Sequence, residues 1–481
     1  MRLNCKTIDF PAIETIIIGN GLSLISLSGG NPKAGQLSLI IQSTLGLTKN
    51  SSDFFIKDSP NDGANPVVVA ISDSIFPFFK QHPDETKIES IEDIPTITLL
   101  NCLEKISDPR KKRGVRHRFQ AILRLVIMGF VSRMVCLEHI VEWAESHWDV
   151  LKGLLGFDRD SPPRATTIGR VLKKVNRESL EQAFRLWVSV CPQVKDRILT
   201  ASVDGKASCN VLDDKKNPLF MVNIFAHDIQ LSLAQAEVEY KKGESTTLRT
   251  MLEGLFESYP GLRILTGDAA FSGRDLCKEI TRLGRHYIMQ IKGNQEHIEE
   301  VLKLHFDEEK ENRLADAKTI DKKKVLGEEI VREIWVCEED AASYVREDLD
   351  FVSAKQVAYI RKTIYLNGKI TKQEDRYGIS SMTKEELPPE LFLEKTRQHW
   401  EVENGLHHVK DRSWHEDHQY SNNKKGGAVL GVLRNLALNV MRVLIPPSLD
   451  RKKRKYEKSL PKQAIAYAAN PLETFKKLCR I

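Results

Sequence analysis

Two aspartates and a glutamate, far apart in the 481-residue chain, are the residues whose types and settings can do chemistry. Asp204 follows an apolar segment and precedes Gly205, and Asp268 follows a second apolar segment that ends in Gly267. Carboxylates without a cage of His or Cys ligands suit Mg²⁺, with Mn²⁺ as a substitute, because such cations prefer oxygen ligands. Two such ions about 4 Å apart activate a nucleophile and stabilise the leaving oxygen of a phosphodiester. Taken singly, each aspartate is also an ordinary turn former or helix cap.

The third acid lies in a segment with the periodicity of a helix. One face of that helix would carry, at intervals of three or four residues, Trp400, Glu403, His407 and Lys410. On that face Glu403 can reach a metal ion, while Lys410, two turns later, can reach a phosphate. The alternative is an amphipathic surface helix with charges placed by chance. His407 and the adjacent His408 diverge on a helix, which favours DNA contacts or core packing over a metal site.

The elements that would position these acids occur in a definite order along the chain. Strands and helices alternate as a strand at 198–203, strands at 218–226 and 231–239, a helix at 246–256, a strand at 263–267, a helix at 276–283 and a strand at 286–291. This order fits an RNase H-like α/β core, a mixed sheet flanked by helices, in which carboxylates sit at the ends of adjacent central strands. We therefore expect Asp204 and Asp268 to meet at neighbouring strand ends.

The residue composition and the hydrophobic pattern change several times along the chain and predict four regions. They are an unassigned extension at 1–90, a helical domain at 91–193, an α/β catalytic domain at 194–443 with a β-rich insertion at about 305–385, and a basic tail at 444–481. The extension reads either as strands or as a loosely ordered segment. The helical domain carries a basic stretch between two of its helices, so it is either a DNA-end-binding domain or a structural cap on the catalytic domain.

Composition points to a multidomain globular protein of ordinary make-up. The chain is 41% hydrophobic and 29% charged, and its length exceeds what one hydrophobic core usually serves. The formal net charge is only +6, but positive charge gathers in runs at 110–113, 322–324 and 451–455. Such runs can neutralise phosphates, although each one alone is also a common solvated loop.

Cysteine usage and hydropathy bear on the compartment. The eight cysteines are scattered without a C-x-x-C pair, which indicates reduced thiols rather than a zinc site. The apolar stretch 122–135 contains two arginines and is too short to span a bilayer. The N-terminus shows no secretory signal, so we expect a cytoplasmic protein without a membrane partner.

Short motifs occur in the order found in one known family. They are Asp108-Pro109-Arg110, Arg113-Gly114, Arg116-His117, Glu142-Trp143-Ala144, Val203-Asp204-Gly205-Lys206, Asp268-Ala269, Tyr287, Lys292-Gly293-Asn294-Gln295, His399-Trp400, Glu403-Asn404, Leu406-His407, Glu416-Asp417 and Leu433-Arg434-Asn435-Leu436-Ala437-Leu438-Asn439. With these motifs the chain resembles the H-repeat-associated insertion-sequence transposases, a branch of the DDE transposases with an RNase H-like core. The resemblance covers about 94–442. It departs from the family pattern at His408, Lys410, Arg412 and Trp414, and leaves the acids intact.

The resemblance implies that Asp204 and Asp268 bind the metal ions and that Glu403 completes the catalytic triad. It implies a nucleoid-associated enzyme that cuts and rejoins double-stranded DNA at terminal inverted repeats and target sites, as at least a dimer when two ends meet. The residues expected to contact DNA are Lys206, Lys292, Asn294, Arg397, His399, Lys410, Arg110, Arg113 and Arg116. Two alternatives stay open: a nuclease on the same fold without strand transfer, and a decayed or domesticated copy that only binds DNA.

Overall fold

The computed structural model describes residues 97–111, 113, 115–239, 243–323, 327–419, 423–444 and 460–481, together with the backbone of four N-terminal strands. These strands form an antiparallel sheet in the order β1-β2-β4-β3: β1 (Ile13–Gly19), β2 (Leu22–Leu27), β3 (Phe54–Lys57) and β4 (Val68–Ser72). The rest of the extension predicted at 1–90, and the basic run at 451–455, lie outside the described residues.

A nine-stranded sheet forms the centre of the molecule, in the order β10-β11-β12-β13-β9-β8-β5-β6-β7. Its strands are β5 (Leu199–Leu212), β6 (Pro218–Ala226), β7 (Leu231–Val238), β8 (Leu262–Gly267), β9 (His286–Ile291), β10 (Ala317–Lys323), β11 (Glu328–Cys337), β12 (Gln356–Leu366) and β13 (Lys369–Ser380). The pairs β5–β8 and β8–β9 are parallel, and all other pairs of this sheet are antiparallel. The half that runs from β7 through β5 to β9 confirms the RNase H-like mixed α/β fold expected from the order of elements.

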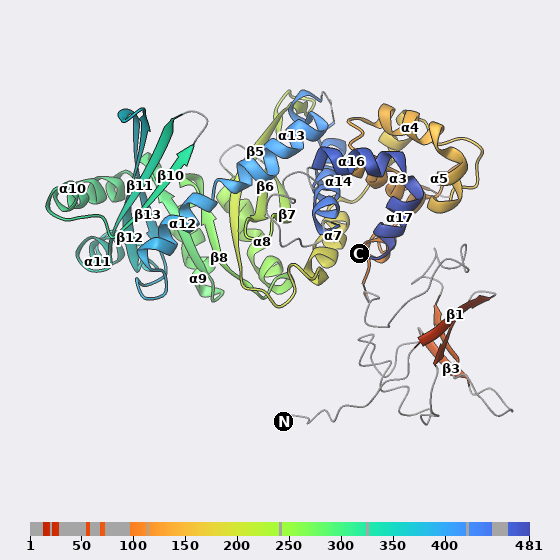
Figure 1. Ribbon diagram of the computed structural model, residues 1–481, viewed down its shortest axis with the longest axis horizontal. Coiled ribbons are helices and arrows are strands. Elements are labelled where there is room, and N and C mark those ends of the chain that lie inside the picture. The colour runs from red at the N-terminus through yellow and green to blue at the C-terminus, as the bar shows by residue number, and fades with distance from the viewer. Residues whose placement is uncertain are drawn as a thin grey trace.

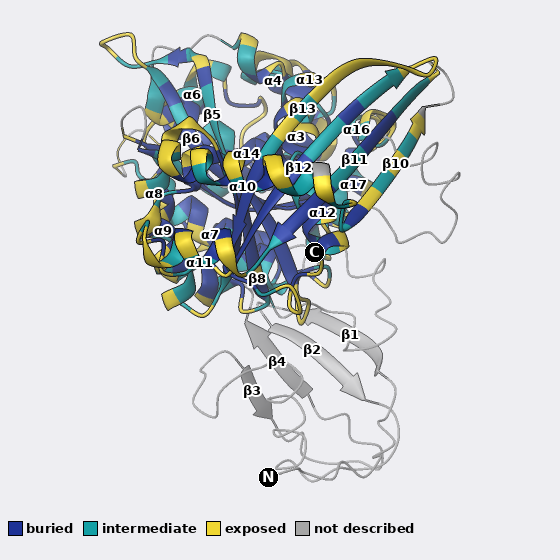
Figure 2. Cartoon of the chain, turned by 90° about the vertical axis from the view of Figure 1, so that its left-hand side faces the viewer, coloured by how far each residue is buried: buried dark blue, intermediate teal, exposed yellow. Residues whose placement is uncertain are grey.

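The remaining four strands extend this sheet rather than forming a separate body. β13 pairs with β9, and β12, β11 and β10 follow outward, so the predicted β-rich segment continues the central sheet at its β9 edge. Two helices that the sequence did not predict accompany it, α10 (Glu296–Asn312) and α11 (Asp340–Glu347). Figure 2 shows buried central strands, whereas the far ends of β12 and β13 stand out from the body with exposed residues.

Helices cover both faces of the central strands, which explains why the first five residues of β5 and five of the six residues of β8 are buried. The covering helices are α8 (Glu244–Ser258), α9 (Arg274–Arg282), α12 (Pro389–Gln398), α13 (His408–Trp414), α14 (Lys424–Val443) and the π-helix η5 (Val402–His407). The buried leucines of α8, at 248, 252 and 255, recur at helical spacing and form a single apolar face. Three short 3₁₀ turns complete the core: η3 (Ala269–Phe271), η4 (Gly293–Gln295) and η6 (Glu416–His418).

The helical region predicted at 91–193 contains α2 (Leu99–Glu104), α3 (Phe119–Val131), α4 (Leu137–Ser146), α5 (Trp148–Leu155), α6 (Ala165–Leu172) and α7 (Arg177–Val190). The C-terminal helices α16 (Leu460–Ala469) and α17 (Pro471–Cys479) pack onto it, as Figure 1 shows at one end of the molecule. The indole nitrogen of Trp143 donates to the Ala468 carbonyl at 3.0 Å. The described part of the predicted C-terminal tail is therefore folded.

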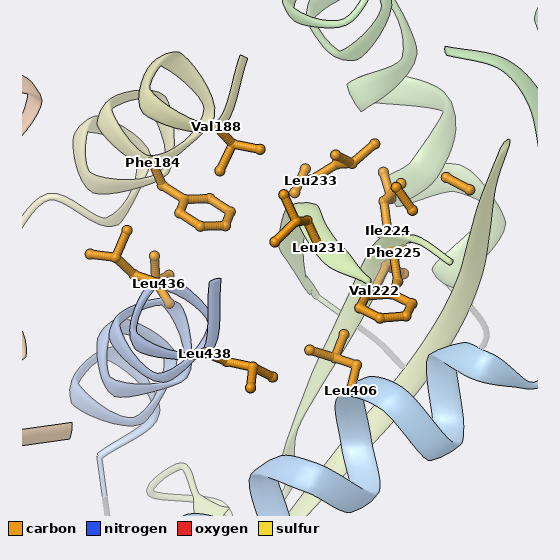
Figure 3. Close-up of a cluster of buried hydrophobic side chains, with 14 of the residues drawn as sticks. Phe184, Val188, Val222, Ile224, Phe225, Leu231, Leu233, Leu406, Leu436 and Leu438 are labelled. Carbon is orange, nitrogen blue, oxygen red and sulfur yellow. The ribbon is translucent and has the colours of Figure 1, made fainter. Parts of the chain in front are cut away.

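One hydrophobic core joins the helical region to the sheet. In Figure 3, Phe184 and Val188 of α7 face the sheet strand that carries Leu231 and Leu233, and Leu436 of α14 packs against α7. The Trp414 indole also donates to the Phe130 carbonyl of α3 at 3.1 Å. This shared core gives the helical region a structural role, whatever else its basic loop does. None of the helices in the described ranges is long and apolar enough to cross a membrane.

Candidate active site

Asp204 and Asp268 lie side by side at the centre of the sheet. In the parallel pairing of β5 with β8, Val203 is the register partner of Gly267, and each aspartate is the next residue along its strand. Because hydrogen-bonded strands lie about 4.8 Å apart, this register brings the two carboxyl groups into one place. β8 ends here, while β5 continues past Asp204.

Each carboxyl group is held by a different contact. Asp204 Oδ2 is 3.2 Å from His407 Nδ1 of η5. Asp268 Oδ1 accepts a hydrogen bond from the Ala270 backbone N–H at 2.9 Å and caps η3. Burial raises the pKa of Asp268, and the charge of Asp204 adds to that effect, while the Ala270 N–H and Lys292 oppose it. The two acids thus repel each other, as expected of a pair that can share a cation.

A glycine keeps the end of β8 close to its neighbours. A Cβ atom at Gly267 would lie 2.6 Å from Met289 Sδ and 2.9 Å from Phe271 Cβ. Any larger residue at position 267 would therefore push the strand end, and Asp268 with it, out of place. Asn294 holds the loop that follows, because its Nδ2 donates to the Ala269 carbonyl at 2.6 Å and to Ser272 Oγ at 3.0 Å. The structure thus places the predicted DNA contact Asn294 as a support for the Asp268 loop.

Glu403 is not brought to the two aspartates. It lies on η5, a π-helical interruption between α12 and α13 where the sequence predicted one continuous α-helix, and it is exposed. Within the described ranges, no group of three or more His, Cys, Asp or Glu side chains is arranged to hold a metal ion. Its neighbour on the same segment, His407, is the residue that contacts Asp204 instead.

Glu403 lines a groove of about 410 Å³ between β11–β13 and the α12–η5 segment. The same groove is lined by Arg332, Lys362, Arg376, Arg397 and Trp400. Arg376 lies over the Trp400 ring, 4.8 Å from its centre, and Arg397 is 3.4 Å from Asp321 Oδ2. Arg397, one of the predicted DNA contacts, is therefore a half-exposed cation on a groove that already holds acidic partners.

A buried chain of polar side chains lies next to the aspartates, on the same face of β5 and β8. Thr266 Oγ1 bonds to His399 Nδ1 at 3.1 Å and to Ser202 Oγ at 3.3 Å, and Ser202 Oγ bonds to His227 Nδ1 at 2.9 Å. Burial lowers the pKa of His399 and of His227 to about 4, so both rings are neutral at pH 7. His399, predicted as a DNA contact, faces the protein and ties the α12–η5 segment to the strands.

Lys410 and Lys206, two further predicted DNA contacts, belong to a buried ion cluster. Lys410 is 3% exposed, and its Nζ lies 3.1 Å from Glu416 Oε2, which Lys206 approaches at 3.5 Å. Arg434 Nη1 is 3.6 Å from the other oxygen of Glu416. Burial raises the pKa of Glu416, but Lys410, Arg434 and Lys206 outweigh it and keep this carboxyl group ionised. In this arrangement Lys410 binds protein and is not accessible to a phosphate.

The remaining predicted contacts differ in exposure. Lys292 is exposed next to Asp268, and Arg113 and Arg116 are exposed on the loop before α3. Arg110 is instead paired with Asp108 at 2.8 Å and donates to the His117 carbonyl, also at 2.8 Å. The cations free to meet a phosphate are therefore Lys292, Arg113 and Arg116, whereas Arg110 shapes the loop.

Sequence reasoning missed Glu244, the first residue of α8. Its pKa is raised by burial and then by the charges of Asp268 and Asp204, which places its carboxyl group near both. An acidic residue in the first turn of a helix is ordinary, because it complements the helix dipole. The sequence offered one hint of a role for Glu244, namely its position after a strand and at the start of a helix.

Two family models of transposases match most of the folded part of this chain. Residues 215–440 match the family model described as the transposase DDE domain, and residues 100–188 match the one described as DDE_Tnp_1-associated. The first match contains Asp268 and Glu403 but begins after Asp204. The position of Asp204 therefore rests on the strand register.

Two curated relatives come from Escherichia coli (strain K12). The putative protein YbfL and the H repeat-associated putative transposase YhhI are each 26% identical over 71% of this chain and 90% of their own length. Among solved structures, a piggyBac transposase synaptic complex with hairpin DNA is similar over 84% of this chain and 80% of that chain, with 12% sequence identity and a TM-score of 0.40.

Proposed function

This chain belongs to the DDE transposases and is related to the H-repeat-associated branch, and from that premise we propose that it cuts and rejoins DNA at the ends of an insertion sequence. The observation that carries the proposal is the side-by-side placement of Asp204 and Asp268 at the ends of parallel central strands. Strand chemistry of this kind needs no covalent enzyme intermediate, and carboxylates that hold metal ions can support it.

The two aspartates fit a divalent cation such as Mg²⁺. They offer oxygen ligands on adjacent strands, and none of the described Lys or Arg side chains forms an ion pair with either. Burial and the neighbouring Asp204 both raise the pKa of Asp268, a cost that a bound cation would remove. When bound, the ions would lower the pKa of the attacking water and stabilise the leaving oxygen.

The chain's own residues orient this centre. His407 Nδ1 fixes the Asp204 carboxyl group, and Asn294 holds the loop that begins at Asp268. The hydrogen bond between Thr266 and His399 attaches the helical segment that carries Glu403 to β8, the strand that leads to Asp268. We assign His399, Asn294 and Lys410 to positioning, and leave phosphate contact to the exposed Lys292, Arg113 and Arg116 and to Arg397.

Glu403 completes the centre in this proposal after a change within η5. A π-helix carries an extra residue in its turn, and such segments often occur at functional sites. Return to α-helical hydrogen bonding would turn Glu403 relative to Lys410 by about 100°, the rotation per residue of an α-helix with 3.6 residues per turn. Because His399 is bonded to Thr266 on the upstream side and Lys410 is paired with Glu416 on the downstream side, the change would be confined to η5.

The experiment uses labelled duplexes that carry the terminal inverted repeats of the element, a target plasmid and Mg²⁺. The wild-type chain is expected to release 3′ ends and join them to the plasmid, acting as at least a dimer that holds two ends. Asp268→Asn is expected to lose at least about 10³-fold in cleavage, since metal-ion catalysis is worth several kcal/mol, while it still binds the duplex.

Asp275→Asn is the matched control, because Asp275 lies on α9, its side chain is 87% exposed and it lies 3.6 Å from Arg249 at the surface. Nicked duplex without joined product would assign the chain to nucleases on the same fold. Equal inactivity of the wild type and Asp268→Asn, with binding retained, would instead identify a copy that only binds DNA.

A further inference from the structure

The carboxyl group of Glu244 fills the space left by a missing side chain at Gly205. A Cβ atom at position 205 would lie 2.7 Å from Glu244 Oε1 and 3.2 Å from both Cδ and Cγ. The backbone of Gly205 is that of an ordinary strand residue, so no turn requires glycine there. The glycine is needed because α8 places an acidic group against the strand.

This position puts a third carboxyl group next to the aspartates. Asp204 points to the face of β5 that η5 covers, and Gly205, the next residue, faces α8, since successive strand residues alternate. β8 ends at Gly267, so past that point nothing in β8 lies alongside β5. Glu244 therefore approaches the pair from the opposite face, around the end of β8.

Charge makes this arrangement unfavourable without a cation. Glu244 is half-buried, and among the described side chains no Lys or Arg forms an ion pair with it. Apart from the N-terminal end of α8, whose dipole favours an anion, its charged neighbours in the folded chain are Asp268 and Asp204. Asp204, Asp268 and Glu244 therefore repel one another, and nothing in the sequence led us to expect an acid from α8 beside the two aspartates.

We infer that Glu244 is a further ligand of the divalent metal centre, joining Asp204 and Asp268 from the α8 face of the sheet. The inference rests on the proposed function, because it concerns the same centre. The three carboxylates are not arranged as a ready ligand set among the described residues, so an ion bound by the aspartates would draw the Glu244 carboxyl group toward them while Glu403 faces the groove. Gly205 belongs to this centre because its missing side chain admits the Glu244 carboxyl group.

The test measures Mn²⁺ binding to the full chain without DNA, from the loss of the free Mn²⁺ paramagnetic resonance signal. We expect Glu244→Gln to weaken Mn²⁺ binding at least tenfold. Gly205→Ala should do the same, because its methyl group would displace the Glu244 carboxyl group. Glu253→Gln, on the same helix and paired with Arg282 at the surface, should bind Mn²⁺ like the wild type.

The failures can be told apart. Wild-type Mn²⁺ affinity in Glu244→Gln, together with a large loss in Asp268→Asn, would overturn the inference and leave the proposed function standing. Wild-type affinity in Glu244→Gln, Asp204→Asn and Asp268→Asn alike would remove both. Thermal unfolding with EDTA completes the test: Glu244→Gln should melt no lower than the wild type, because it removes like-charge repulsion, and a lower melting temperature would mean that Glu244 is structural.

Discussion

The chain positions its acidic groups in two ways, and the two regions contrast sharply. On the strands, Asp204 and Asp268 are placed by hydrogen-bond register, which fixes every residue of a pair at once. On the helix, Glu403 sits on a π-helical interruption, exposed and facing a groove. The strand acids are arranged before any ligand binds, whereas the helix acid needs a local change to reach them.

This contrast between the strand acids and Glu403 indicates which part of the helix is fixed and which part can change its conformation. His399 and Lys410 hold the helix on either side of the interruption, one through Thr266 of β8 and the other through Glu416. Both anchors are buried, so the short η5 segment between them is where a change can occur. A metal centre borne by strands and completed by a movable helix would couple cleavage to the arrival of DNA.

Breaking the downstream anchor is expected to give the largest change in stability. Lys410→Met leaves the buried Glu416 with fewer partners, and removal of one member of a buried pair costs about 3 kcal/mol. Urea unfolding should show this loss, while Mn²⁺ binding by the strand acids should persist in the folded fraction. Lys152→Met is the control, because its pair with the fully exposed Asp160 lies at the surface, where water and salt screen it, and it should leave the stability nearly unchanged. A loss below 1 kcal/mol for Lys410→Met would mean that the cluster does not anchor the helix.

Glu181, a buried acid outside the candidate active site, should have a smaller effect on stability, and this effect should depend on pH. Burial raises the pKa of Glu181 on α7 to about 7 from an ordinary value of 4.5, and Arg177 and Arg185 offset only part of this. The folded chain therefore holds this proton more tightly than the unfolded chain, so the group's contribution to stability is lost as pH rises from about 4.5 to 7. Relative to the wild type, Glu181→Gln should gain on the order of 2 kcal/mol in unfolding free energy between pH 4.5 and pH 8.

Urea unfolding at the two pH values checks this, with and without Mn²⁺. The gain in unfolding free energy should be the same with and without Mn²⁺, because Glu181 lies on α7 and does not belong to the proposed metal centre. A constant difference between Glu181→Gln and the wild type at all pH values would contradict the buried, protonated state.

Much of the core could be predicted from the sequence because strands leave a strong pattern. The apolar runs before Asp204 and Asp268 predicted neighbouring strands and hence the meeting of the two acids, and the structure pairs these strands in parallel. The β-rich segment was also visible, although its fusion with the central sheet at β9 was not, since pairing between distant strands leaves no local signal.

The rest depended on tertiary contacts. Helical spacing placed Glu403 and Lys410 on one face, but it could not reveal the π-helical interruption that separates them. Lys410 was predicted to contact DNA because it follows Glu403 by two turns on one helix face. Lysine is almost never fully buried without a partner, and here Glu416 is the partner that lets Lys410 enter the interior. Glu244 looked like an ordinary first-turn acid until the fold placed it against Gly205.

The central claim, that Asp204 and Asp268 hold the divalent ions, is tested most directly by Fe²⁺-directed cleavage of the protein backbone. Fe²⁺ bound in place of Mg²⁺, with ascorbate and peroxide, cuts the chain next to its ligands. We expect cuts beside Asp204 and Asp268, suppressed by excess Mg²⁺ and absent in Asp268→Asn. A pattern without cuts beside Asp204 and Asp268, or an unchanged pattern in Asp268→Asn, would contradict the claim, whereas an additional cut beside Glu244 agrees with its place in the centre.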